Sequence, residues 1–203
     1  MKLSILMCGL PSRLESGMRL LTELHGQIQA LPNPADAEVI YLLDTWHMSV
    51  GEKRNRLLDA ARGDYVVFVD DDDRIEPDYV QAFVDATETG ADALCPQVMV
   101  TFNGRRPTLC TYTASHRGDD RRERLGTVRR ITRITNHICA VKRSLAVRVR
   151  FPNASFAEDA DYAHRLAHHI GSEHQIGRVL YHYRYSSATT ETQRPEHRAR
   201  TYA

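Results

Sequence analysis

The chain has 203 residues, 42% of them hydrophobic and 26% charged, which is enough apolar material for the core of one globular domain. Its formal net charge of +1 excludes a strong overall field that would select an acidic or a basic partner. No apolar run is long enough for a transmembrane helix, and the apolar part of residues 1–13 is too short for a signal peptide. Because the four cysteines lack a metal-type spacing and three lie in apolar segments, we expect reduced thiols in a cytoplasmic protein.

Strand and helix patterns alternate along the N-terminal half. Strand patterns cover residues 2–8, 38–43, 64–69 and 91–100, and helix patterns cover residues 12–31, 51–62 and a segment that begins at Pro77. We expect Ser12 and Glu15 to cap the first helix, and Gly63 to end the second. The alternation predicts an α/β fold in which helices flank a mostly parallel mixed sheet. Neither GxGxxG nor GxxxxGK[ST] follows the first strand, so a metal and side chains would have to hold any phosphates.

Four consecutive carboxylates, Asp70 to Asp73, follow the buried strand pattern at residues 64–69. Carboxylates this close raise one another's pKa unless a cation neutralises them. At the carboxyl end of a strand in an open α/β sheet, they suit Mg²⁺ or Mn²⁺ completed by substrate phosphates. We therefore predict Asp70 and Asp72 as metal ligands, and Asp70 and Asp71 as donor-binding residues. The alternative is a solvated acidic turn in which Asp73 or Asp78 only caps the next helix.

Charged side chains near the second strand and second helix are candidates for binding a nucleotide. Asp44 ends the strand, where its carboxylate could hydrogen-bond a base or a ribose. Lys53 and Arg54 lie near the start of the helix, where anions bind, and a cation there suits a leaving diphosphate. The alternative for this segment is a solvated basic helix face, which we favour for Arg56.

The C-terminal half begins with a strong hairpin signal, Asn103-Gly104, between strand patterns at residues 97–102 and 108–113. Residues 115–126 are polar and predict a loop. Basic side chains dominate residues 117–150 and include Arg121, Arg122, Arg124, Arg129, Arg130, Arg133, Lys142 and Arg143. They indicate either a solvated surface or a patch for an acidic acceptor such as DNA or a phospholipid-linked sugar acceptor. The lack of interleaved aromatic residues argues against base stacking.

Two further groups of candidate residues come near the C-terminus. Glu158 and Asp159 precede a helix pattern at residues 160–170, where they could cap the helix or accept a proton from a substrate hydroxyl. His182 lies in a last strand pattern at residues 179–186 and is either a metal ligand or an ordinary strand residue. We expect residues 187–203 to form a polar tail or a mobile lid.

Three of these segments resemble landmarks of the family-two glycosyltransferases with the GT-A fold. They are the Asp-x-Asp-Asp signature at Asp70, Asp72 and Asp73, the helix that carries Lys53, Arg54 and Asn55, and the pair Glu158-Asp159. The resemblance implies one compact GT-A domain over residues 1–186, with a nucleotide- and metal-binding half at 1–100 and an acceptor half at 101–186. It places Gly9, Pro11 and Arg13 beside the nucleotide base. It also implies that Asp159, next to Glu158, is the general base, with Asp161 as the alternative.

The resemblance implies a metal-dependent inverting transferase that moves a sugar from a nucleotide-diphosphate sugar, with UDP-sugar favoured, to an acceptor hydroxyl. The Gln-x-x-Arg-Trp set of processive synthases is missing, because Gln193-Arg194 has no matching Trp and the single Trp is Trp46. We therefore expect a non-processive enzyme. One alternative is a nucleotidyltransferase, which usually carries a Gly-rich basic loop after the first strand. The other is a non-catalytic module that binds carbohydrate or nucleic acid.

Overall fold

The computed structural model describes residues 1–45, 47–116, 118 and 120–185. The predicted polar tail or lid at residues 187–203, with Gln193 and Arg194, and the single tryptophan, Trp46, lie outside the described residues. No helix in the described part of the chain is long and apolar enough to cross a membrane.

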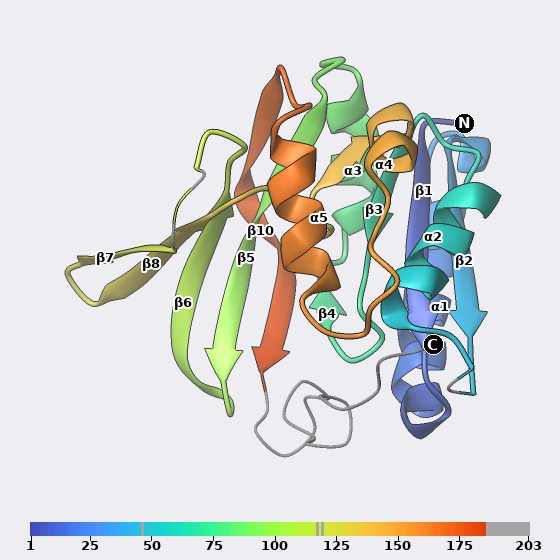
Figure 1. Cartoon of the computed structure of the whole chain (residues 1–203), viewed down its shortest axis with the longest axis horizontal. Helices are drawn as coiled ribbons and strands as arrows, with labels where there is room; N and C mark the ends of the chain where they lie inside the picture. The colour runs from blue at the N-terminus through green and yellow to red at the C-terminus, as the bar shows by residue number, and fades with distance from the viewer. Residues whose placement is uncertain (46, 117, 119, 186–203) are drawn as a thin grey trace.

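The sheet is parallel in its N-terminal part and mixed beyond it (Figure 1). The parallel part has the order β2 (Ala37–Leu43), β1 (Leu3–Gly9), β3 (Tyr65–Phe68). The mixed part contains β9 (Ala140–Lys142), β5 (Ala93–Phe102), β6 (Arg105–Tyr112), β8 (Val128–Arg133) and β7 (Arg121–Leu125). β10 (Glu173–Tyr185) runs parallel to β5 and pairs with the short strand β4 (Arg74–Ile75). The predicted α/β class with a mixed sheet is confirmed.

Helices cover both faces of the sheet (Figure 1). α1 (Leu14–Gln29) and α3 (Tyr79–Thr87) contact each other on one face, while α2 (Val50–Ala60), α4 (Arg143–Val149) and α5 (Glu158–Ala167) pack together on the other. Two 3-10 turns, η1 (Pro11–Arg13) and η2 (Pro34–Asp36), precede α1 and β2. Because both faces are covered, β3 is buried along its whole length, which explains its continuous apolar sequence.

Aromatic rings pack between the central strand β3 and the helix α5. The ring of Phe68 on β3 meets the edge of Phe151 at a centroid distance of 5.3 Å. Phe151 in turn stacks on Tyr162 of α5 at 3.9 Å. This packing fixes the start of α5 relative to the end of β3.

The N-terminal boundaries of two helices differ from the sequence-based expectations. Ser12 does not cap α1, because Pro11 starts a 3-10 turn and the helix begins only at Leu14 without a side-chain cap. Ser49 caps α2 instead, accepting a bond from the Glu52 N–H. Gly63 does not end α2, which stops at Ala60; a side chain at Gly63 would overlap the Ser4 backbone, so glycine is needed there for space.

Two hairpins lie in the C-terminal half. The turn predicted for the first is confirmed, and the loop predicted where the second lies is wrong. Asn103 and Gly104 both have positive φ, 51° and 69°, as a two-residue I′ turn requires. The polar segment predicted as a loop contains strand β7, which pairs with β8 through a turn at Gly126. Its polar sequence is explained by the solvent exposure of Arg121, Arg122 and Arg124.

Candidate active site

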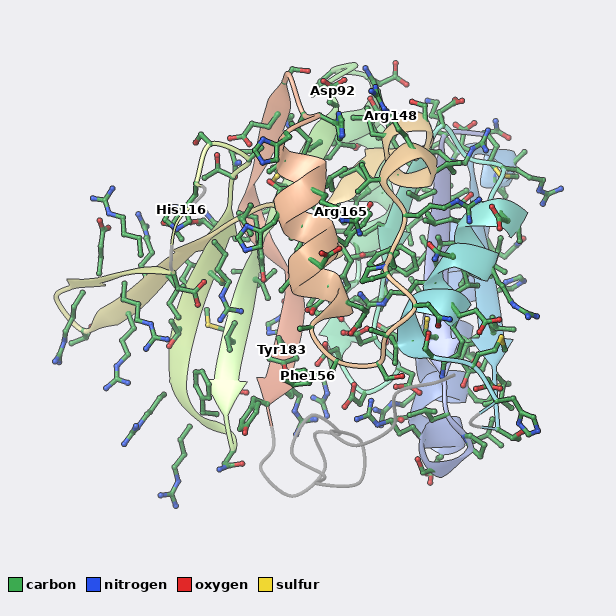
Figure 2. All side chains as sticks on the ribbon, viewed as in Figure 1. Asp92, His116, Arg148, Phe156, Arg165 and Tyr183 are labelled. Atoms are coloured by element: carbon green, nitrogen blue, oxygen red, sulfur yellow. The ribbon has the colours of Figure 1, made fainter. Side chains whose placement is uncertain are left out.

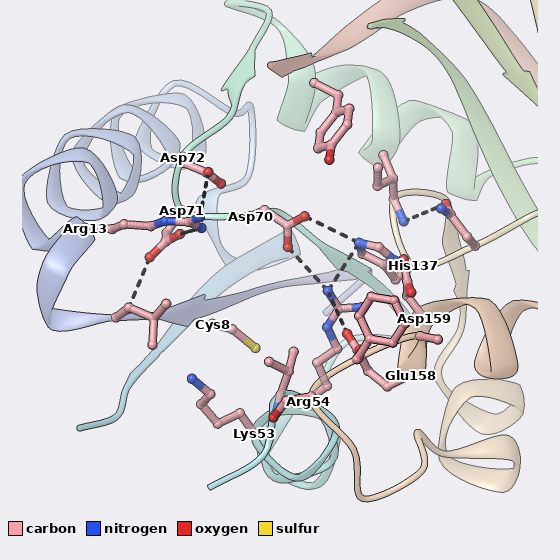
Figure 3. Close-up of a pocket in the computed structure, with 18 of the residues that line it drawn as sticks. Cys8, Arg13, Lys53, Arg54, Asp70, Asp71, Asp72, His137, Glu158 and Asp159 are labelled. Atoms are coloured by element: carbon pink, nitrogen blue, oxygen red, sulfur yellow. Dashed lines mark hydrogen bonds and ion pairs between the residues drawn. The ribbon is translucent and has the colours of Figure 1, made fainter. Parts of the chain in front are cut away.

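A cavity of ≈ 270 Å³ opens at the carboxyl ends of β1 and β3 (Figure 3). Ligands bind at this edge in open α/β sheets. Its lining comes from both halves of the chain and includes Cys8, Leu10, Arg13, Lys53, Arg54, Asp70, Asp71, Asp72, Arg133, Asn136, His137, Glu158, Asp159, Tyr183 and Arg184. The aspartate run, the basic residues of α2 and the Glu-Asp pair thus meet in one place.

Asp70 lies between the side chains of Arg54 and His137. Its Oδ1 is 3.4 Å from Nη2 of Arg54, and its Oδ2 is 3.6 Å from Nε2 of His137. Burial alone would raise the pKa of Asp70, but His137 and Arg54 outweigh it and hold that pKa well below its usual range. The carboxylate is therefore ionised, as a metal ligand must be.

Arg13 connects the turn after β1 to the aspartate run. Its Nη1 donates to Asp71 at 3.1 Å, and its Nη2 is 3.0 Å from Oδ2 of Asp72. Asp71 also accepts from the Leu10 N–H. Burial raises the pKa of Asp71 to about 6, against the lowering effect of Arg13. Asp71 thus joins two loops, while Asp72, whose side chain is 33% exposed, lines the cavity.

Asp73, the last of the four consecutive aspartates, is not among the residues that line the cavity. It is buried, and its Oδ2 accepts from the Tyr181 hydroxyl at 2.7 Å, while its Oδ1 accepts from the Arg184 N–H. The Tyr181 hydroxyl also accepts from the Asp70 N–H at 3.1 Å. These bonds attach the aspartate run to β10.

Arg54 is a buried cation with unused hydrogen-bonding capacity. It lies over the rings of Phe68 and Phe151, and its Nη2 is 3.8 Å from Oε1 of Glu158. Within the described part of the chain, its Nε and Nη1 and the Nδ1 of His137 are buried without a hydrogen-bond partner. Because unpaired buried donors are costly, this arrangement fits a site completed by a polar or anionic ligand.

Lys53 lines the cavity, whereas Asp44 is not part of its lining. Nζ of Lys53 is 3.8 Å from Oδ2 of Asp44, and Asp44 also accepts from the N–H groups of His47 and Met48. Burial would raise the pKa of Asp44, but these N–H groups and Lys53 lower it overall. Asp44 therefore holds the turn after β2 and the ammonium group of Lys53.

The first N–H groups of α2 already have protein partners. Val50 donates to Oγ of Ser155, Gly51 to the carbonyl of Ala154, and Glu52 to Oγ of Ser49. The start of α2 is therefore not the anion site that the sequence suggested. An anion in this cavity would instead meet the side chains of Lys53 and Arg54.

α5 begins at the Glu-Asp pair, after a strained residue. Ala157 is in the left-handed region, with φ 58° and ψ 14°, which is uncommon for a residue with a side chain. Glu158 is buried, and burial raises its pKa against the effect of Arg54. Asp159 is half-buried and lines the cavity, whereas Asp161 pairs with Arg165 on α5 and is not part of the lining.

His182 and Pro11 are not brought to the cavity. Nε2 of His182 is 2.6 Å from Oε1 of Glu76, and its neighbours Tyr183 and Arg184 line the cavity instead. No group of three His, Cys, Asp or Glu side chains with metal-binding geometry occurs among the described residues. Mg²⁺ often uses only one or two carboxylates plus phosphates, so Asp70 and Asp72 still fit such an ion.

His137 is the main site residue that sequence reasoning missed. It lies between β8 and β9, where β9 brings it beside the end of β3. Its N-terminal neighbours Thr135 and Asn136 form no motif that would have marked it in the sequence.

Comparison with known proteins decides the family. A family model described as glycosyl transferase family 2 matches residues 23–150, more than half of the chain. The chain belongs to this family. EpsH of Bacillus subtilis, which carries the name of a glycosyltransferase, is 26% identical over 147 residues, covering 68% of this chain and 42% of EpsH.

Solved structures confirm the GT-A fold of this family-2 chain. S. aureus TarS 1–349 in complex with UDP matches with a TM-score of 0.66 and 19% identity, over 92% of this chain and 61% of TarS. The complex with UDP-GlcNAc matches with a TM-score of 0.66 and 17% identity, over 100% of this chain and 62% of TarS. The chain thus spans less than two thirds of each of these relatives.

Proposed function

We propose that this family-2 chain transfers a sugar from a UDP-sugar to an acceptor hydroxyl, with inversion at the anomeric carbon and without processivity. One observation carries the proposal: Asp70 and Asp159, far apart in sequence, line the same cavity together with Arg13, Lys53 and Arg54. A carboxylate for a metal, cations for a diphosphate and a second carboxylate for a proton are the groups that such a reaction needs. The UDP and UDP-GlcNAc complexes of TarS support the choice of donor.

The donor side consists of the aspartate run and the cations around it. Asp70 and Asp72 would hold Mg²⁺ or Mn²⁺, which would neutralise charge developing on the leaving diphosphate. Arg13, Lys53 and Arg54 add positive charge around the same space. Arg54 also keeps Asp70 ionised. Asp44 acts on the nucleoside side by positioning Lys53 and the turn after β2.

The acceptor side depends on Asp159. As the acceptor oxygen forms its bond to the anomeric carbon, the bond to the diphosphate oxygen breaks and Asp159 takes the hydroxyl proton. Glu158 positions Arg54 through their ion pair and does not take this proton itself. A single displacement of this kind inverts the anomeric configuration.

The substitution Asp159→Asn tests the assignment of the base. It should leave UDP affinity unchanged and lower the rate of UDP release from a UDP-sugar by at least about 100-fold, because general base catalysis typically contributes that much. Asp161→Asn is the matched control, since it removes a carboxylate from the same helix outside the cavity. Asp161→Asn should turn over at the wild-type rate, and a wild-type rate in Asp159→Asn would rule out Asp159 as the base.

A further inference from the structure

A groove continues from the cavity toward the β7–β8 hairpin. It has a volume of ≈ 690 Å³ and is lined on one side by α5 residues such as His164 and on the other by Asp120 and Arg122. Arg133, Asn136 and Asp159 line both the groove and the cavity. The groove therefore leads directly to the carboxylate that we propose as the base.

Arginines follow one face of the hairpin outward from this groove. In the register of the hairpin, Arg122 lies opposite the buried residue Ile131, and Arg124 lies opposite Arg129. Residues directly opposite each other, and residues two positions apart on one strand, share a face of a sheet. Arg122, Arg124, Arg129 and Arg133 thus form one row, which we call the arginine track.

The opposite face of the hairpin has a different charge pattern. There Arg121, whose side chain is 70% exposed, pairs with Glu123 at 2.6 Å, and Arg130 lies opposite Glu123 in the register, so this face carries two cations and one carboxylate. On the track, the acidic neighbour is Asp120, which accepts two bonds from Arg133 at 3.0 and 2.9 Å. Arg122, Arg124 and Arg129 are exposed, although Nε of Arg124 donates to the carbonyl of Gly126. Positive charge is therefore concentrated on the face that leads to Asp159.

We propose that the groove and the arginine track bind the acceptor, and that this acceptor is a polymer other than a nucleic acid, with phosphate groups along its chain. The proposal rests on the proposed function and adds the class of acceptor. Arginines two positions apart on a strand are separated by about 7 Å, so an extended chain can offer successive phosphates to successive guanidinium groups. The hairpin strands contain no aromatic residue, which favours a chain read through its phosphates over one read through stacked bases.

Binding of a fluorescently labelled linear polyphosphate tests the track. Arg122→Gln and Arg129→Gln should each weaken binding about tenfold, because each removes a charge-assisted contact to phosphate. Each should also lower the slope of log Kd against log salt concentration by about 1. Arg121→Gln removes the same charge from the opposite face of β7, and it should change Kd by no more than about twofold.

Several outcomes would overturn the proposal. The wild type could fail to bind polyphosphate, or Arg121→Gln could weaken binding as much as the track variants do. Tighter track-dependent binding of single-stranded DNA would indicate a nucleic-acid reader, and preferential binding to vesicles of anionic lipid would indicate a membrane surface. UDP titration of the same proteins separates the two proposals: wild-type protein that binds polyphosphate but not UDP would contradict the proposed donor and leave the track supported.

Discussion

At the scale of single residues, the Tyr181 hydroxyl holds the aspartate run in place. It donates to Asp73 and accepts from the Asp70 N–H, and the whole residue is buried. Without this hydroxyl, a buried carboxylate and a backbone N–H would each lose a partner. Tyr181 therefore controls where the carboxylate of Asp70 lies without lining the cavity itself.

Tyr181→Phe should lower the free energy of unfolding by about 1–3 kcal/mol, the usual cost of leaving buried polar groups unpaired. It should also weaken UDP binding severalfold, because Asp70 loses a support. Tyr65→Phe is the control, since the Tyr65 hydroxyl donates to the Ala91 carbonyl and Tyr65 is not part of the cavity lining. Denaturant titration and calorimetry measure both effects. Equal loss of UDP affinity in the two variants would contradict this role.

Glu158 gives a prediction about pH. Burial raises its pKa above the ordinary 4.5, so at pH values above 4.5 the folded state holds this proton more strongly than the unfolded state. The free energy of unfolding contributed by Glu158 must therefore fall as pH rises through that window. The free energy of unfolding of the wild type relative to that of Glu158→Gln, measured by denaturant titration, should decrease from pH 4 to pH 8. A stability difference between the two proteins that stays constant from pH 4 to pH 8 would contradict the raised pKa of Glu158.

Most of the charged residues predicted for the site do line the cavity, whereas some predicted residues do not and a further lining residue was not predicted. Asp70, Asp71, Asp72, Lys53, Arg54, Glu158, Asp159 and Arg13 all line the cavity, as their order along the chain had suggested. Asp44, His182 and Pro11 do not line the cavity, and His137, which does, was not predicted. The position of His137 depends on the pairing of β9 with β3, a contact between distant segments that local patterns do not reveal.

At the scale of elements, α2 positions two of the three cations of the donor side, Lys53 and Arg54, through a tight contact at its first turn. Gly51 donates to the Ala154 carbonyl, and any side chain at Gly51 would overlap the carbonyl oxygen of Pro152. The helix thus lies against the segment that leads to α5. This contact sets the distance between the cations and the Glu-Asp pair.

Gly51→Ala should lower the free energy of unfolding by about 3 kcal/mol, because the backbone must move to relieve the overlap. Gly26→Ala is the control within another helix: nothing lies within 4 Å of its new methyl group, and it should stabilise the protein by about 0.8 kcal/mol through helix propensity. Thermal and denaturant unfolding measure both. Equal effects of the two variants would contradict the packing described for α2.

Elements with strong apolar periodicity were predictable, whereas β7 was not. β1, β2 and β3 lie close to their predicted ranges because their sequences are mostly apolar; β1 and β3 are buried along nearly their whole length, and β2 is half-buried. β7 reads as a polar loop because its arginines face solvent, and its strand conformation depends on pairing with β8. Edge strands of this kind carry little signal in the sequence itself.

At the scale of the whole molecule, the N-terminal and C-terminal halves are interleaved. β9 inserts between β3 and β5, and β10 returns beside β5 and contacts the aspartate run through Tyr181 and Arg184. The sequence anticipated a nucleotide half and an acceptor half, and both contribute side chains to one cavity (Figure 3). Figure 2 shows Phe156 and Tyr183, which both line the cavity, near the same end of the sheet.

The most direct test of the donor site is calorimetric titration of the wild type and Asp70→Asn with UDP, with and without Mn²⁺. The wild type should bind UDP at least about tenfold more tightly with Mn²⁺, because the ion would link Asp70 to the diphosphate. Asp70→Asn should lose this metal dependence, while Asp161→Asn should keep it. Equal UDP affinity of the wild type with and without Mn²⁺, or an undiminished response in Asp70→Asn, would contradict the proposed metal-dependent donor site.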